Sequence, residues 1–165
     1  MIPVDLYKTL LQFQSSLDLG VIDLNPSFNS REVWVHYDEP AENVKRYTYV
    51  ILEGRKVIAL AALTPADPLN GKAVMALGYA VHEDHRGKGL AKKIAGAAVK
   101  EFDFGIRKHK IPLMYIEASV EVRNVASNVV SKSIFGEIVQ TGIDHRNNEA
   151  INLYRKFVGI RPFEI

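Results

Sequence analysis

Two glycines in a short charged turn are the residues of this chain best suited to bind an anion. Gly87 and Gly89 lie in the run HEDHRGKG, between the apolar, β-rich run 73–81 and an alanine-rich run of helical periodicity that begins near Gly89. Glycine lets a backbone approach a ligand closely, and a helix start adds unpaired N–H groups and the positive end of the helix dipole. We therefore expect the main-chain amides of this turn to bind a phosphate.

Two common phosphate-binding motifs do not fit this turn. A Walker loop requires Ser or Thr after Gly-Lys, but here Gly89 follows Gly87 and Lys88. A dinucleotide-binding fingerprint requires glycine or alanine three residues after its second glycine, and Lys92 stands there. A nucleotide site is therefore a third-ranked hypothesis, and a glycine-rich turn before a capped helix, without any ligand, is the structural alternative.

The pattern Arg86-x-x-Gly89-x-Ala91 resembles the pyrophosphate loop of the GNAT superfamily of acyl-CoA N-acyltransferases, which follows Gln/Arg-x-x-Gly-x-Gly/Ala. The run 81–89 is also similar to the family's strand end, except that Glu83 stands where proline is common. The resemblance implies that acetyl-CoA is the acyl donor and that the loop amides bind its pyrophosphate. The residues of this loop are Arg86, Gly87, Lys88, Gly89, Leu90 and Ala91.

The same resemblance assigns residues to the pantetheine arm of the donor. It implies that the amides of Ala80 and Val81, at the end of the preceding strand, hydrogen-bond to this arm, and that one of them stabilises the oxyanion. Asn124 and Ser127 in the run NVAS resemble the family's Asn-x-x-Ser/Ala helix opening, where the asparagine helps to hold the arm. Asn124 is equally suited to be the N-cap of that helix.

An amine that attacks the thioester must lose a proton, which calls for a carboxylate, an imidazole or an ordered water. Glu117 is our first choice, because a charged residue inside the apolar run LMYIEASV needs a reason. Tyr79 in the preceding strand, and His82 and Glu83 at its end, are further candidates. Each of these four residues has a structural or surface role as its alternative.

The residue that would protonate the leaving thiolate is less evident. Family members often carry a tyrosine late in the helix that opens with NVAS, and Ser131 occupies that position here. A second register, Asn147-x-x-Ala150-x-x-x-Tyr154, matches the helix phrase and would supply Tyr154 as the acid. We rank it second, because apolar and polar residues alternate around Tyr154 as in a terminal strand.

Hydrophobic periodicity predicts the elements that position these residues. The resemblance implies an α/β fold with a mixed, mostly antiparallel central sheet flanked by helices. We expect Asp38-Glu39-Pro40 to end the strand over 32–37. Gly105 is a reasonable stop signal for the helix that starts at Leu90, although helical residues continue toward His109. The expected helices are 5–16, 90–104 and 124–135, the strands are 32–37, 47–52, 55–63, 73–81, 113–120, 136–143 and 150–157, hairpin turns fall at 53–54 and 146–148, and 64–72 is a loop.

Composition limits the classes of function. A chain of 165 residues that is 47% hydrophobic can fill one core, so we expect a single domain over 1–165. A net charge of +2 is too balanced for a general nucleic-acid binder. The absence of cysteine excludes disulfides, thiolate metal sites and an acyl group carried on an enzyme thiol. His82 and His85 could suggest a metal site, but the run HEDH offers no further ligand with clear spacing, so we expect no metal site there.

We therefore expect a cytoplasmic GNAT-type N-acetyltransferase in which acetyl-CoA reacts directly with an amine. No run is apolar and long enough to span a bilayer, and the start MIPVDLYK lacks a basic region followed by an apolar one. The acceptor stays open among a small amine, a protein lysine or N-terminus, and an aminoacyl-tRNA, and a homodimer is open too. The alternative function is a non-catalytic acyl-CoA-binding or interaction module on the same fold.

Overall fold

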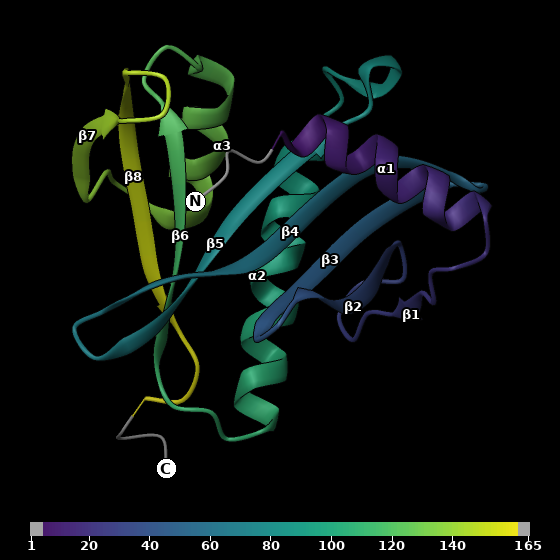
Figure 1. Ribbon diagram of the computed structural model, residues 1–165, viewed down its shortest axis with the longest axis horizontal. Helices are drawn as coiled ribbons and strands as arrows, with labels where there is room; N and C mark the ends of the chain where they lie inside the picture. Colours follow the sequence, from purple (N-terminus) through teal and green to yellow (C-terminus); the bar gives the residue numbers. More distant parts are fainter. Residues whose placement is uncertain (1–4, 162–165) are drawn as a thin grey trace. The chain divides into compact units, whose positions relative to one another are not determined.

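The protein has an α/β fold, which Figure 1 shows for the computed structural model; it describes residues 5–161. Residues 1–4 and 162–165, the two ends of the domain expected over 1–165, lie outside this description. The strands are β1 (Asn25–Pro26), β2 (Val33–Ala41), β3 (Val44–Glu53), β4 (Lys56–Leu69), β5 (Lys72–Val81), β6 (Met114–Glu121), β7 (Gln140–Asp144) and β8 (Glu149–Val158). The helices are α1 (Leu6–Asp18), α2 (Leu90–Lys108) and α3 (Val125–Phe135), and a short 3₁₀ turn, η1, covers Glu83–His85.

One sheet of eight strands has the hydrogen-bonded order β1-β2-β3-β4-β5-β6-β8-β7. Strands β5 and β6 pair in parallel, whereas β1–β2, β2–β3, β3–β4, β6–β8 and β7–β8 pair antiparallel. The expected mixed and mostly antiparallel sheet with helices is therefore confirmed. Among the described residues, no helix is long and apolar enough to cross a membrane.

Contacts group the chain into two compact units that are interleaved in the sequence. The first unit contains the described residues up to Thr64 together with Gly78–Glu101, and the second contains Pro65–Leu77 and the described residues from Phe102 onward. Strands β4 and β5 and helix α2 each contribute residues to both units. No single cut in the chain separates the units, and the single domain stays a prediction.

In the first unit, α1 packs its apolar face on β3 and β4. Leu10 and Phe13 form a buried cluster with residues that include Val50 and Leu60. The helix begins after Asp5, whose carboxylate accepts hydrogen bonds from two N–H groups of the first turn at 3.0 and 3.2 Å. This N-cap satisfies donors that have no intrahelical partner, and it confirms the helix expected over 5–16.

Helix α1 also lies very close to β5. A Cβ atom added to Gly78 would come within 2.9 Å of the Leu6 side chain, a distance that real Cβ contacts do not show. A side chain at position 78 would therefore force the Leu6 side chain to move, so glycine here allows close approach rather than an unusual backbone conformation. The contact fixes the start of α1 against the strand that leads into the glycine-rich turn.

A buried carboxylate fastens the segment before β2 to α2, also within the first unit. Glu101 is only 6% exposed, and it accepts hydrogen bonds from the backbone N–H groups of Phe28 and Asn29 at 2.8 and 2.5 Å. Buried charge is tolerated only when it is hydrogen-bonded or paired. Glu101 thus holds an otherwise irregular segment in place.

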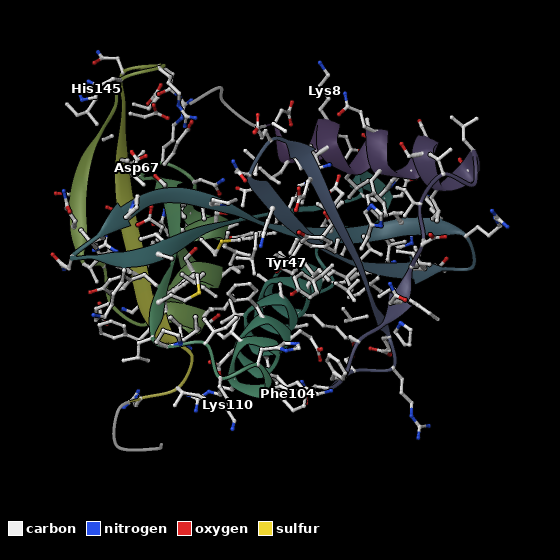
Figure 2. The ribbon with its side chains drawn as sticks, turned by 60° about the horizontal axis from the view of Figure 1, so that its bottom comes forward. Lys8, Tyr47, Asp67, Phe104, Lys110 and His145 are labelled. Atoms are coloured by element: carbon white, nitrogen blue, oxygen red, sulfur yellow. The ribbon has the colours of Figure 1, made fainter. Side chains whose placement is uncertain are left out.

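In the second unit, β6 alternates as a strand with one buried face. Met114, Ile116, Ala118 and Val120 are all buried, and Ala118 lies opposite the buried Tyr154 of β8. The hairpin β7–β8 carries exposed polar residues at its turn, where His145 lies (Figure 2). The hairpin predicted to turn at 146–148 is confirmed.

Several predicted boundaries are wrong; the strand expected over 136–143, for example, begins only at Gln140. Strand β2 continues through Asp38-Glu39-Pro40 to Ala41, and the expected loop 64–72 is the end of β4 and a tight turn at Asn70-Gly71, both with positive φ. Proline suggested loops, but Pro40, Pro65 and Pro68 stand at exposed strand positions, where proline is tolerated. Helix α2 does not stop at Gly105 but ends at Lys108, which agrees with the alternative prediction of a helix that continues toward His109. A glycine inside a helix costs only about 1 kcal/mol, and burial of Ile106 offsets this cost.

Replacing Glu101 with alanine should lower the free energy of unfolding by about 2–4 kcal/mol, because two backbone N–H groups lose the buried carboxylate that accepts from them. Urea unfolding of purified protein measures this change. Lys100→Ala, which alters the exposed neighbour on the same helix, is the control and should have little effect. Equal stabilities of the Glu101→Ala variant and the wild type would show that Glu101 does not hold this segment.

Candidate functional site

The glycine-rich turn joins β5 to α2, as the sequence predicts. Strand β5 ends at Val81, η1 follows, and α2 begins at Leu90. Gly87 and Gly89 have φ angles of 77° and 76°, in the left-handed region that favours glycine. A Cβ atom at either glycine would meet nothing within 4 Å, so the space beside both is open.

Within the described residues, few protein acceptors face the backbone amides of this turn. Within residues 5–161, no amide from Arg86 to Lys92 donates a hydrogen bond of ordinary geometry to another residue; the Lys93 N–H, next in line, donates to the Gly89 carbonyl oxygen at 3.2 Å. Consecutive unpaired amides at a helix start form a site for an anion. The exposed side chains of Arg86, Lys88 and Lys92 add positive charge.

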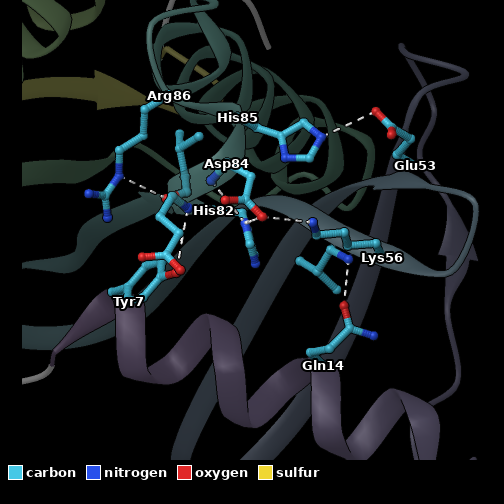
Figure 3. Close-up of polar contacts among 11 residues, drawn as sticks. Tyr7, Gln14, Glu53, Lys56, His82, Asp84, His85 and Arg86 are labelled. Atoms are coloured by element: carbon cyan, nitrogen blue, oxygen red, sulfur yellow. Dashed lines mark hydrogen bonds and ion pairs between the residues drawn. The ribbon is translucent and has the colours of Figure 1, made fainter.

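Tyr7 of α1 supports the turn from the side, within the first unit. Its hydroxyl accepts a hydrogen bond from the Glu83 N–H at 3.4 Å, and the Arg86 guanidinium lies 5.1 Å from its ring centroid. Arg86 Nε also donates to the Val81 carbonyl oxygen at 3.4 Å, as Figure 3 shows. The Arg86 guanidinium is therefore held between Tyr7 and the end of β5.

The β3–β4 hairpin holds the turn from another direction (Figure 3). His85 is 8% exposed, and its Nε2 lies 3.3 Å from a carboxylate oxygen of Glu53, while Lys56 pairs with Asp84 at 3.4 Å. Within the described residues, the buried Nδ1 atom of His85 has no hydrogen-bond partner. His82 caps the start of η1, since its Nδ1 accepts from the Asp84 N–H at 3.2 Å.

A metal site has little support at these histidines. Within the part of the chain that the structure describes, no three His, Cys, Asp or Glu side chains come together as a group that could hold a metal ion. His82 and His85 face each other edge to face, with ring centroids 5.9 Å apart, and each uses a ring nitrogen for a contact within the turn or its hairpin. Both histidines have structural roles in this arrangement.

The end of β5 carries three of the predicted site residues. Tyr79, Ala80 and Val81 are half-buried, and Ala80 packs against the core cluster beneath α1. Within the first unit they lie on the same continuous segment as the turn from Arg86 to Ala91. The structure therefore brings the predicted strand end and the predicted phosphate loop together.

In the second unit, Asn124 is the N-cap of α3. Its side-chain oxygen accepts a hydrogen bond from the Ser127 N–H at 3.0 Å, so the capping role proposed for it is confirmed. Its contact with an acyl-CoA arm stays a prediction. Ser131, which stands where family members often have tyrosine, is fully buried.

The rival register that makes Tyr154 a helical residue is wrong, because Tyr154 lies in β8. The tyrosine is 2% exposed, and its hydroxyl donates to Asn128 Oδ1 at 2.7 Å. Asn152 Nδ2 donates to the same oxygen, and Asn128 Nδ2 in turn donates to backbone oxygens at the end of β6 and in the first turn of α3. Asn128 was not among the predicted site residues, and its only signal was a polar residue four positions after the N-cap.

Glu117 has a partner that explains its place in an apolar strand. It lies opposite Arg155 in the β6–β8 register, and Arg155 donates to Glu117 Oε2 from Nη2 at 3.2 Å and from Nε at 3.4 Å. The Glu117 side chain is 23% exposed and the Arg155 side chain is 19% exposed. Arg155 was also missed, although a second charge in the terminal strand was its signal.

A pair of glycine substitutions tests the backbone of the turn. Gly89→Ala should cost about 1–2 kcal/mol, because its φ of 76° strains any residue with a Cβ atom. Gly96→Ala, at a helical position of α2 with open space around it, should instead stabilise the fold by about 0.5–1 kcal/mol. Urea unfolding measures both changes. If Gly89→Ala stabilises the protein as Gly96→Ala does, the left-handed conformation at Gly89 is incorrect.

Comparison with protein families gives one clear match. The profile described as the acetyltransferase (GNAT) family matches residues 14–127, which is more than half of the chain and includes the turn and the start of α3. No curated protein matches the sequence.

Solved structures with the same fold include several acetyltransferases. RimL, a ribosomal L7/L12 alpha-N-protein acetyltransferase in complex with coenzyme A, has a TM-score of 0.53 at 17% identity, with 68% of this chain and 62% of that chain covered. Ribosomal-protein-S5-alanine acetyltransferase from Vibrio fischeri has 0.56 at 15%, with 71% and 63% covered. NAA60 from Arabidopsis thaliana, in complex with a bisubstrate analogue, has 0.51 at 14%, with 71% and 77% covered. At these identities the likeness shows the fold.

Proposed function

This chain belongs to the acetyltransferase (GNAT) family, and on that premise we propose that it transfers an acetyl group from acetyl-CoA directly to an amine. As a member of the family it is an acyltransferase that uses acetyl-CoA as cosubstrate. The observation that carries the assignment of the donor site is the run of unpaired amides from Arg86 to Lys92. In our proposal these amides bind the two linked phosphates of coenzyme A.

The charges around the turn support this assignment. Arg86, held beside Tyr7, and the exposed Lys88 and Lys92 supply positive charge to a diphosphate, and the α2 dipole adds to it. Leu90 and Ala91 contribute the first amides of the helix. The proposal also assigns the amides of Ala80 and Val81 to the pantetheine arm, and Asn124 and Ser127 to a second contact with the donor.

The chemistry that we propose is a direct displacement. The amine attacks the thioester carbonyl, the C–N bond forms, the C–S bond breaks and coenzyme A leaves as the thiolate. A strand-end amide of β5 stabilises the oxyanion, and Glu117 accepts the proton that the amine loses. The roles expected for Tyr79 and Tyr154 stay predictions; the buried hydroxyl of Tyr154, engaged with Asn128, favours a structural role for it.

The acceptor is open among a small amine, a protein amine and an aminoacyl-tRNA. Two of the structural neighbours are described as acting on the α-amino group of L7/L12 and on the alanine of protein S5, so a free protein N-terminus is the first acceptor to test. The proposal places the reaction in the cytoplasm. It includes a possible homodimer, which light scattering after size-exclusion chromatography measures.

Calorimetry with acetyl-CoA tests the donor site. Arg86→Glu and Gly89→Glu should each weaken binding by about tenfold or more, because a carboxylate then faces the diphosphate and, at residue 89, the positive φ is also strained. Lys100→Glu makes the same change of charge as Arg86→Glu on the exposed side of α2, away from its start, and should bind as the wild type does. Wild-type affinity in both turn variants would contradict the assignment of the loop.

The second candidate function is a non-catalytic acyl-CoA-binding module, which the buried Ser131 at the expected tyrosine position favours. Measuring the release of free coenzyme A thiol distinguishes an enzyme from such a module. The panel contains peptides with a free N-terminal serine or alanine, an N-blocked lysine peptide, spermidine and an aminoacyl-tRNA. We expect thiol release with at least one member, and mass spectrometry should find the acetyl group on its amine. Tight binding of acetyl-CoA with no turnover across the panel would favour the module.

A further inference from the structure

We propose that Arg155 is a positioning residue for acetyl transfer, which holds the Glu117 carboxylate so that one oxygen is occupied and the other is open to the acceptor amine. The inference rests on the proposed role of Glu117 as the base. Both residues belong to the second unit, on the neighbouring strands β6 and β8.

The geometry of the pair is one-sided. Arg155 donates from Nη2 and from Nε to the same carboxylate oxygen, Oε2, at 3.2 and 3.4 Å. Within the described part of the chain, Glu117 Oε1 accepts no hydrogen bond, and it is not among the buried side-chain atoms that lack a partner. A two-oxygen fork would occupy both sites, whereas this contact leaves Oε1 accessible.

Aromatic side chains fix the guanidinium in this orientation. The Arg155 guanidinium carbon lies 5.6 Å from the centroid of the Tyr115 ring, within the range of a cation–π contact. Tyr115 is itself stacked on Phe157, with ring centroids 4.5 Å apart and planes 28° from parallel. A planar guanidinium can lie against a ring and still donate to a carboxylate, which the ammonium of lysine does less well.

Glu117 and Arg155 are both partly buried, and this explains why the carboxylate is paired with a cation. Glu117 is 23% exposed and sits between apolar strand neighbours, and a partly buried carboxylate is stabilised when a cation is paired with it. In the transfer step Glu117 Oε1 takes the proton from the attacking amine, while Arg155 keeps its own protons throughout. Arg155 therefore acts through Glu117 and not on the substrates.

Steady-state kinetics with the best acceptor of the amine panel test the inference. Arg155→Met should lower kcat by about tenfold or more, with the KM for acetyl-CoA within twofold of wild type, because orientation of the base and not donor binding is lost. Arg155→Lys should recover part of the rate, and added methylguanidine should recover part of the rate of Arg155→Ala. Lys156→Met, at the exposed next residue of β8, is the control. Circular dichroism checks folding, and Arg155→Lys carries the test if the methionine and alanine variants do not fold.

A double-mutant cycle separates this inference from the assignment of the base. Glu117→Gln should lower kcat by about a hundredfold, and adding Arg155→Met or Arg155→Lys to it should lower kcat no further, because both residues act through one carboxylate. A large effect of Glu117→Gln with additive or absent effects at Arg155 would overturn the inference and leave the base in place. A Glu117→Gln enzyme with wild-type kcat would overturn both, while acetyl transfer itself would stand.

Discussion

The unpaired amides from Arg86 to Lys92 are the constraint on which the first unit depends. A backbone segment without protein acceptors gains nothing from its own hydrogen bonds, so its shape must come from its neighbours. Tyr7 on one side, and Glu53 and Lys56 on the other, supply those contacts. Most of them reach the 3₁₀ turn η1 and the side chain of Arg86, and they leave the amides themselves unoccupied. The neighbouring side chains thus fix the conformation of the turn while its backbone N–H groups stay free to bind a ligand.

The second unit solves a different problem, which is to keep polar groups inside a sheet-and-helix layer. The Asn128 side chain accepts hydrogen bonds from Asn152 and Tyr154 of β8. It donates to backbone oxygens at the end of β6 and at the start of its own helix, and it thereby gives the buried Tyr154 hydroxyl an acceptor. Arg155 does the same for Glu117 on the neighbouring strand. Tyr154 and Glu117 thus each have a specific polar partner, and such matching specifies register, since a slip by one residue would break both arrangements.

Much of the fold followed from local sequence, because the turn and its flanking elements carry strong short-range signals. The glycine-rich turn between a strand and a helix, and the N-cap role of Asn124, were predicted and are observed. The positive φ angles of Gly87 and Gly89 are a finding of the structure. The wrong boundaries at 64–72 and Gly105 arose where proline and glycine preferences were overridden by pairing and burial. The partners Arg155 and Asn128 were missed because strand register and helix docking, which bring distant residues together, leave no local trace. Contacts of the site residues with a donor stay predictions.

The close approach of α1 to β5 has a consequence for how this sequence can change over time. Leu6 fills the space that a side chain at position 78 would need, so the two positions share one volume. A larger residue at 78 requires either that the Leu6 side chain moves or that residue 6 becomes smaller, and a smaller residue 6 alone leaves a void. Homologues that keep this helix placement should therefore show paired replacements at the two positions, a covariation that marks the contact without any knowledge of the structure.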